Sequence, residues 1–232
     1  MHVRYVVKLK ILRRYRCPSS LDTLQLVLSD DTGDRIQATI GEGYVANISS
    51  RLIEGRWIFI KDFDLVNAVG SFRLTLHDYK ICWKLETSCW KIGPLASGDD
   101  FGFVQFEDII GGFRDPNFSV DLIGRLVSII DFDHSDPGDY GCQQLYLELE
   151  NEASTRIRCR LSRAYYQKCL EGLRNCNDHI IICVMQFAKL ELSRGIVQAT
   201  TACTCTQLLF NPMFNEVSRM RAVFAASEYG TS

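Results

Sequence analysis

Leu24–Ile40 reads LQLVLSDDTGDRIQATI and returns without a gap as LYLELENEASTRIRCRL at Leu145–Leu161, an offset of 121 residues. Each copy alternates apolar and polar residues, passes through a polar turn and alternates again, which predicts a β-hairpin. The residues expected to face inward in the second arm are Ile36, Ala38 and Ile40 in one copy and Ile157, Cys159 and Leu161 in the other. The sequence therefore predicts the same hairpin twice.

The repeat continues beyond the hairpin. WIFIKDF at residues 57–63 parallels IICVMQF at residues 181–187 with an offset of 124, so about three residues are inserted between. A period this long is typical of a duplicated domain, because solenoid units repeat every 20–50 residues or so. Short helices are expected near residues 44–52 and 164–173, and a strand at residues 72–79. Each half thus predicts a small Greek-key barrel of short strands with one helix.

Turn-forming residues separate the two halves. We place the first domain at residues 1–92, a connector at residues 93–117 and the second domain at residues 118–232. The connector holds Gly93-Pro94 and Gly111-Gly112, but its phenylalanines suggest that it packs partly on a domain. A capped helix is expected to close the chain at residues 215–226.

Composition predicts a folded, soluble protein. Of the 232 residues, 47% are hydrophobic and 23% are charged, enough to form globular cores. The longest apolar runs, such as residues 180–185, are strand-sized and too short to span a membrane. The N-terminus lacks the apolar block of a secretory signal. We therefore expect an intracellular protein with no membrane partner.

The ten cysteines are scattered, and the nearest pair, Cys203 and Cys205, is not a CxxC knuckle. Reduced thiols are therefore favoured over disulfides or zinc ligands. The histidines (His2, His77, His134 and His179) have no partners at metal-ligand spacing. The acidic loop 131–139 begins like a calcium loop but has Asp136 and Cys142 where glycine and glutamate are needed. The sequence thus predicts no metal.

Catalytic signatures are also missing. The sequence contains no phosphate-binding loop, dinucleotide fingerprint or nucleophile elbow. The pair Asp30-Asp31 ends a strand, where it is turn chemistry first. We expect a protein that is not an enzyme, with no catalytic residue and no cofactor.

The net charge of −2 hides a segregation of charge along the chain. The first sixteen residues carry six cations and no acid, whereas residues 99–139 hold ten acids against two arginines. Basic residues return between Arg156 and Lys168. Such local basic patches on a near-neutral protein favour a bounded footprint for a polyanion.

Several segments together resemble a known family. They are the hairpin at 24–40, the segment 72–79, FGFVQFEDI at 101–109 leading into VDLIG at 120–124, and FNP at 210–212 followed by Glu216-Val217 and Met220-Arg221. In order and spacing they are similar to the tandem DNA-binding domains of the replication protein A large subunit, in the branch expanded in plants. The resemblance covers nearly the whole chain. It implies two tandem OB-fold barrels, single-stranded DNA binding in replication, repair or recombination, a nuclear location and partner subunits of the same kind.

The first domain has the residues that such binding needs. OB-folds bind single strands on strands two and three and the flanking loops, using cations for phosphates and aromatic rings for bases. The expected contacts are Arg13, Arg14, Tyr15, Arg16, Arg35, Gln37, Phe72 and Arg73. The alternative is a solvated charged edge with Phe72 in the core.

The second domain carries Arg156, Arg158 and Arg160 on one strand face, because side chains alternate along a strand. Like charges in a row suggest a polyanion partner, with Arg194 as a further contact; a merely soluble face is the alternative. The acidic loop 131–139 would repel phosphates, so weak binding is expected here.

Compared with the family, aromatic platforms are missing at Gly41, Ser162 and Leu192, Gln37 replaces an arginine, and the zinc-bearing third domain is absent. Two hypotheses therefore stay open. The first is a module for single-stranded DNA, or for RNA. The second is a protein-interaction module, or a shortened or transposon-associated copy of a longer gene, with little affinity for nucleic acid.

Overall fold

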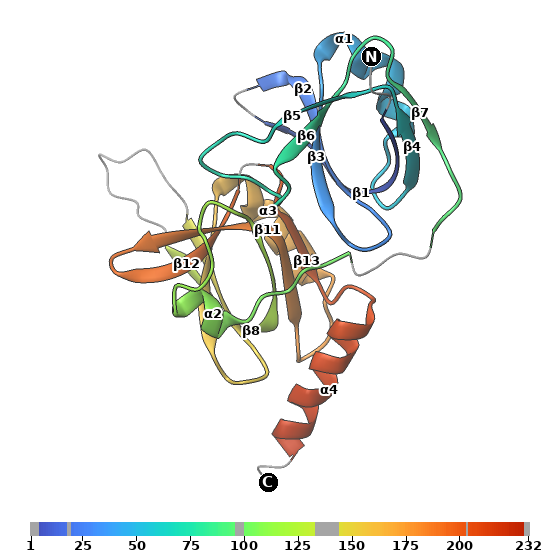
Figure 1. Ribbon diagram of the computed structural model, residues 1–232. Helices are drawn as coiled ribbons and strands as arrows, with labels where there is room; N and C mark the ends of the chain where they lie inside the picture. Colours follow the sequence, from blue (N-terminus) through green and yellow to red (C-terminus); the bar gives the residue numbers. More distant parts are fainter. Residues whose placement is uncertain (1–4, 18–19, 96–99, 133–143, 203, 230–232) are drawn as a thin grey trace. The chain divides into compact units, whose positions relative to one another are not determined.

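The computed structural model describes residues 5–17, 20–95, 100–132, 144–202 and 204–229. The chain forms two compact units (Figure 1). The first runs to Gly102 and also includes Thr204 and Cys205, and the second runs from Phe103 to Ala202 and from Thr206 onward. The expected connector, 93–117, includes helix α2 (Phe106–Ile110), whose Phe106 and Ile109 lie in the core of the second unit.

The second unit is a closed barrel. Its elements are β8 (Val120–Phe132), β9 (Gln144–Glu150), β10 (Arg156–Leu161), α3 (Arg163–Arg174), β11 (Ile182–Ser193), β12 (Ile196–Thr201), β13 (Gln207–Phe210) and α4 (Asn215–Tyr229). Strand β12 pairs parallel with β10 and antiparallel with β11, which closes the ring of five strands. Strand β13 extends the sheet from β11. This order of strands, with a helix between the third and fourth, is the OB-fold.

The first unit has the same order in a curled sheet. Its elements are β1 (Val6–Cys17), β2 (Ser20–Ser29), β3 (Arg35–Ile40), α1 (Glu42–Ile48), a 3-10 turn (Ser49–Arg51), β4 (Trp57–Lys61), β5 (Asp64–Asn67), β6 (Tyr79–Cys82) and β7 (Ser88–Lys91). Strand β4 pairs with β1, and β5 pairs with β6, which lies parallel to β3. The expected all-β fold of two OB barrels with short helices is confirmed, as are the helices near 44–52, 164–173 and 215–226.

One expected strand is wrong. Residues 68–78 form a loop, and the strand begins at Tyr79. The apolar alternation of FRLTLHDY suggested a strand, but the adjacent Leu74 and Thr75 are both buried, which a regular strand on one face of a sheet does not allow.

The two units share their backbone irregularities. The β1–β2 register shifts between Ile11 and Arg13, and the β8–β9 register shifts between Leu126 and Ser128. A residue with positive φ interrupts the same place in each unit: Asp62, at 58°, directly follows β4, and Phe187, at 57°, lies within β11 where its register to β8 shifts. Both features are β-bulges or bends at equivalent places.

The offset of 124 predicted for the fourth strand is wrong by one residue. The core positions Ile58 and Ile60 of the first unit correspond to Cys183 and Met185 of the second, an offset of 125. A one-residue slip exchanges the two faces of a strand. The sequence does not indicate this shift, because WIFI and IICV are apolar on both faces.

Each unit has its own aliphatic core. The hairpin leucines Leu26 and Leu28, and their equivalents Leu147 and Leu149, are fully buried. The described cysteines Cys82, Cys89, Cys159, Cys169, Cys176 and Cys183 are free thiols, and Cys142 and Cys203 lie outside the described residues. Burial raises the pKa of Cys159 to about 12, so this thiol stays protonated and unreactive at neutral pH. Among the described helices, none has the length and apolar character to cross a membrane.

The equivalent leucines give a test of this division. We expect Leu26→Ala and Leu147→Ala each to lower the free energy of unfolding of their own unit by about 2–5 kcal/mol, because a buried cavity remains. Hydrogen exchange read by mass spectrometry should show lost protection in the substituted unit. Equal loss in both units would contradict two separate cores.

Candidate nucleic-acid interface

The outward side chains of β9 and β10 make up the β9–β10 face of the second unit. The strand register places Arg156 opposite Glu150, Arg158 opposite Glu148, and Arg160 opposite Tyr146. The expected alternation is present: the three arginines point outward and Ile157, Cys159 and Leu161 are buried.

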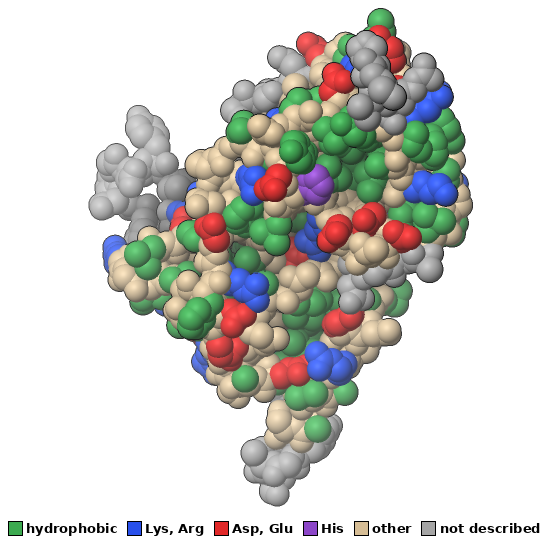
Figure 2. Space-filling model, in the orientation of Figure 1, with side chains coloured by type: hydrophobic (Ala, Val, Ile, Leu, Met, Phe, Trp, Pro, Cys, Tyr) green, Lys and Arg blue, Asp and Glu red, His purple; other side chains and the backbone are tan. Residues whose placement is uncertain are grey.

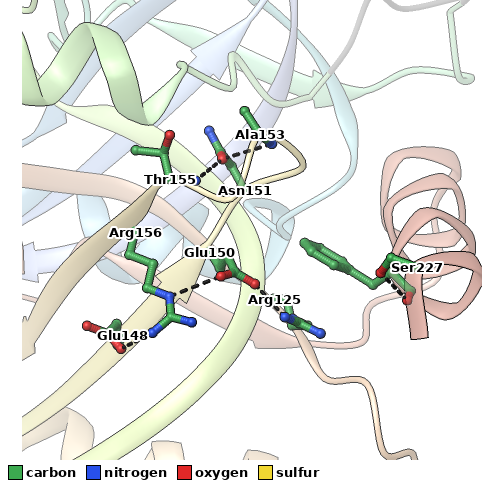
Figure 3. Close-up of polar contacts among 9 residues, drawn as sticks. Arg125, Glu148, Glu150, Asn151, Ala153, Thr155, Arg156 and Ser227 are labelled. Carbon is green, nitrogen blue, oxygen red and sulfur yellow. Dashed lines mark hydrogen bonds and ion pairs between the residues drawn. The ribbon is translucent and has the colours of Figure 1, made fainter. Parts of the chain in front are cut away.

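Acidic side chains neutralise two of the three arginines. Arg156 donates to Glu150 at 3.0 Å and to Glu148 at 3.4 Å (Figure 3). Arg160 forms an ion pair with Glu191 at 2.8 Å. These ion pairs reduce the repulsion between the neighbouring arginines. A polyanion is therefore not needed to explain why three arginines lie in one row.

Arg158 is different. Its guanidinium lies 5.9 Å from the centre of the Tyr146 ring, and among the described residues no carboxylate lies within ion-pair distance of it. The exposed guanidinium can bind a phosphate, and the neighbouring ring offers a flat surface on which a base can stack. Tyr146 was not expected as a site residue, although the alternation of LYLELE places it outward.

A buried carboxylate organises one end of this face. Glu150 accepts hydrogen bonds from Arg156 and from Arg125 of β8, and Arg125 lies 4.5 Å from the Phe224 ring of α4. Burial by itself would raise the pKa of Glu150, but the two arginines outweigh it and lower the pKa below 4.5. Figure 3 shows Glu150 between the two guanidinium groups.

The loops of the second unit give a mixed result. Arg194 is exposed in the turn between β11 and β12, with φ of 51°, and Leu192 beside it is 72% exposed. Ser162 is the N-cap residue of α3, and its hydroxyl oxygen accepts a hydrogen bond from Thr201. The acidic loop 133–139 lies outside the described residues.

In the first unit, the outward side chains of β2 and β3 make up the β2–β3 face. Arg35 donates to the Asp100 carbonyl oxygen at 2.9 Å, and the Asp100 carboxylate forms an ion pair with Lys10 at 2.6 Å. Gln37 accepts a hydrogen bond from the Leu74 backbone N–H at 3.2 Å. The loop 68–78 and Asp100 therefore already contact two of the side chains expected to bind a ligand.

Arg73 and Phe72 belong to that loop. Arg73 donates to the Ala68 carbonyl oxygen at 3.0 Å, within its own loop. Phe72 is half-buried and does not belong to the core cluster. Phe72 is therefore not a core residue, and its role as a stacking platform stays a prediction.

The basic segment at the end of β1 lines a pocket of about 410 Å³ with residues Arg14, Tyr15, Arg16, Leu24, Leu52, Ile53 and Glu54. Glu54 pairs with Arg13 at 3.0 Å and accepts the Arg14 backbone N–H at 2.7 Å. The Arg14 guanidinium donates to Ser49. Gly41, the other missing platform, is the N-cap residue of α1. The lining of the pocket thus includes one aromatic residue, two arginines and one carboxylate.

Across the described residues, no three His, Cys, Asp or Glu side chains gather as a metal site. The outward side chains of both faces include cations, aromatic rings and hydrogen-bonding groups, which are the kinds of group that contact phosphates and bases in single-strand-binding proteins.

Comparison with known proteins identifies the architecture. The sequence model of a family described as a domain of unknown function, DUF223, matches residues 2–112. No curated protein matches the sequence. A replication protein A heterotrimer bound to single-stranded DNA matches in structure with a TM-score of 0.64 and 17% identity, over 97% of this chain and 53% of that chain. The chain thus spans about half the length of that relative.

Two further structures match over most of this chain. A murine DNA-binding protein bound with double-stranded DNA matches with a TM-score of 0.50 and 7% identity, over 90% of this chain and 99% of that one. The HINb domain of p204 matches with a TM-score of 0.50 and 8% identity, over 90% and 98%. The fold is a tandem OB-fold like that of replication protein A.

Glu150 predicts a dependence of stability on pH. A carboxylate whose pKa is lowered in the folded state stabilises it above pH 4.5, and that stabilisation is lost as the pH falls through the folded pKa. We expect Glu150→Gln to lower the free energy of unfolding by roughly 1–3 kcal/mol at pH 7. The substitution should also reduce the amount by which the free energy of unfolding falls between about pH 5 and about pH 3. Urea unfolding at several pH values measures both.

Glu148→Gln is the matched control, since that carboxylate is more exposed and makes one longer contact. Its effect should stay below about 1 kcal/mol. Equal effects of the two substitutions would show that the Glu150 pair is no more than a surface contact.

Proposed function

We propose that this chain binds single-stranded DNA through its two OB barrels. The observation that carries the proposal is the match to replication protein A bound to single-stranded DNA, which follows both barrels in order over 97% of this chain. Proteins that hold single strands combine cations with rings on which bases stack. The Arg14–Tyr15–Arg16 pocket and the Arg158–Tyr146 pair supply that combination in the first and second units.

The two units contribute unequally in this proposal. The first offers the pocket at the end of β1 and, as a further ring, Phe72 in the loop 68–78 between β5 and β6. The second offers Arg158 and Arg194, while Arg156 and Arg160 are held by carboxylates. We assign the larger share of affinity to the first unit.

The wider role follows from the same family resemblance. We propose a nuclear, non-enzymatic protein of the replication protein A large-subunit type, from the branch expanded in plants, that works in replication, repair or recombination with partner subunits of that kind. DNA is the proposed ligand, and an oligouridine of equal length tests RNA.

A second candidate is a protein-interaction module with little affinity for nucleic acid. The observation that favours it is the neutralisation of Lys10, Arg156 and Arg160 by carboxylates of the same unit. A phosphate would have to compete with these internal partners.

Fluorescence anisotropy with a labelled oligothymidine of about 20–30 nucleotides distinguishes the two. We expect binding that weakens steeply with salt, because neutralised phosphates release counterions. Absence of binding at low salt would refute the proposal and favour the interaction module.

Two substitutions then test the unequal shares. Tyr15→Ala should weaken binding by roughly five- to 150-fold, the range for one stacked base. Arg158→Gln should weaken binding less, and Arg156→Gln serves as its control on the same face, since that arginine is already paired and the change introduces no new charge beside Glu148 and Glu150. The reverse order of effects would place the main site in the second unit.

A further inference from the structure

The outer surface of β1, β4 and β7 in the first unit lies away from the β2–β3 face. Cross-strand pairing places Lys8, Phe59 and Trp90 in one outward row, and Val6, Lys61 and Ser88 in the next. We call these six residues the β1–β4–β7 face. Figure 2 shows hydrophobic and basic atoms side by side over the part of the first unit that holds β4 and β7.

Aromatic rings and cations meet on this face. The Phe59 and Trp90 rings stack with centroids 4.5 Å apart, and the Lys61 ammonium lies 5.9 Å from the Trp90 ring. Trp90 keeps 42% of its surface exposed, although it is a large ring in an ordered strand. None of the six outward residues is acidic, and the nearest carboxylate contact of Lys61 is Asp62 at 4.0 Å. An exposed aromatic surface of this kind marks an interaction site.

In the second unit a helix covers the equivalent strands, so their outward side chains can be compared with those of the β1–β4–β7 face. The row that corresponds to Lys8–Phe59–Trp90 is Ile123–Val184–Leu209 on β8, β11 and β13. Helix α4 packs over these strands through the buried Val217, Met220 and Phe224.

The side chains of the two rows differ in chemistry. An aliphatic row suits the apolar side of a helix, as in the second unit. The row in the first unit replaces the aliphatic side chains with a lysine and two stacked rings, next to a second lysine. Charge and ring chemistry here fit an anionic ligand with flat π surfaces, and unpaired bases on a phosphate backbone have both.

We propose that the β1–β4–β7 face is a second contact surface for single-stranded nucleic acid, with a base stacking on Trp90 and phosphates at Lys8 and Lys61. This inference rests on the proposed function and adds a surface outside the strands and loops that OB-folds ordinarily use. Rows on one strand face lie roughly 7 Å apart, so the two lysines can reach neighbouring phosphates of one strand.

The three tryptophans allow a direct test on the full chain. Trp57 and Trp83 are 4% and 8% exposed, so a base that stacks on Trp90 should quench the exposed fraction of the emission. Titration with an unlabelled oligothymidine should therefore quench the intrinsic fluorescence. Trp90→Phe should abolish the quenching and keep binding within about threefold, because phenylalanine still stacks.

Binding measured by anisotropy completes the test. Trp90→Ala should weaken binding at least about fivefold, the low end for one stacked base. Lys8→Glu should weaken it as well and reduce the salt dependence. The matched controls are Phe113→Ala, an exposed ring of the second unit, and Arg174→Glu, an exposed cation at the end of α3; both should bind as the parent chain does.

The outcomes separate the two proposals. Binding without quenching, unchanged by Trp90→Ala and Lys8→Glu, would overturn this inference and leave the proposed function intact. Failure of the oligonucleotide to bind at all would overturn both. Self-association that Trp90→Ala abolishes, without any quenching by oligonucleotide, would identify the face as a protein contact and overturn the inference.

Discussion

The burial of one face of the repeated hairpin is the constraint on which the rest of the structure depends. Leu24, Leu26 and Leu28, and their partners Ala38 and Ile40, have almost no exposed surface, and the second unit repeats this arrangement. Because side chains alternate along a strand, fixing these residues inside fixes every neighbouring residue outside. The outward chemistry of Arg35 and Gln37, or of Arg156, Arg158 and Arg160, follows from the leucines behind them.

Much of the fold could be predicted from the sequence because this constraint is local. The hairpins, the helix after each, and the terminal helix all follow from apolar periodicity within short windows. The offset of 124 predicted for the fourth strand is wrong by one residue because apolar residues occupy both faces of that strand. Periodicity therefore carries no information about which of its side chains point inward. The strand predicted at residues 72–79 is wrong for a related reason: Leu74 and Thr75 are buried side by side while Leu76 is exposed, so burial in the loop does not follow the alternation of its apolar residues.

The candidate site was less predictable, because it depends on pairs of residues far apart in the chain. The outward direction of the three arginines can be predicted from the sequence. The outward direction of Glu148 and Glu150 can be predicted in the same way, since the hairpin register places these two residues opposite Arg158 and Arg156. Glu191 and Asp100 could not be paired with Arg160 and Lys10 by any local pattern. The row Lys8–Phe59–Trp90 brings together three strands separated by connections of tens of residues.

The shared bends of the two barrels constrain the strands that contain them. A bulge adds one residue to one strand, and losing it would exchange the two faces of everything downstream on that strand. The bends after Ile11 and Leu126, and at Asp62 and Phe187, are therefore hard to change singly. Surface rows have no such restriction, as the contrast between Lys8–Phe59–Trp90 and Ile123–Val184–Leu209 illustrates. The bends are therefore the feature that the two halves of the repeat have in common, whereas the outward rows of side chains are where the two barrels differ.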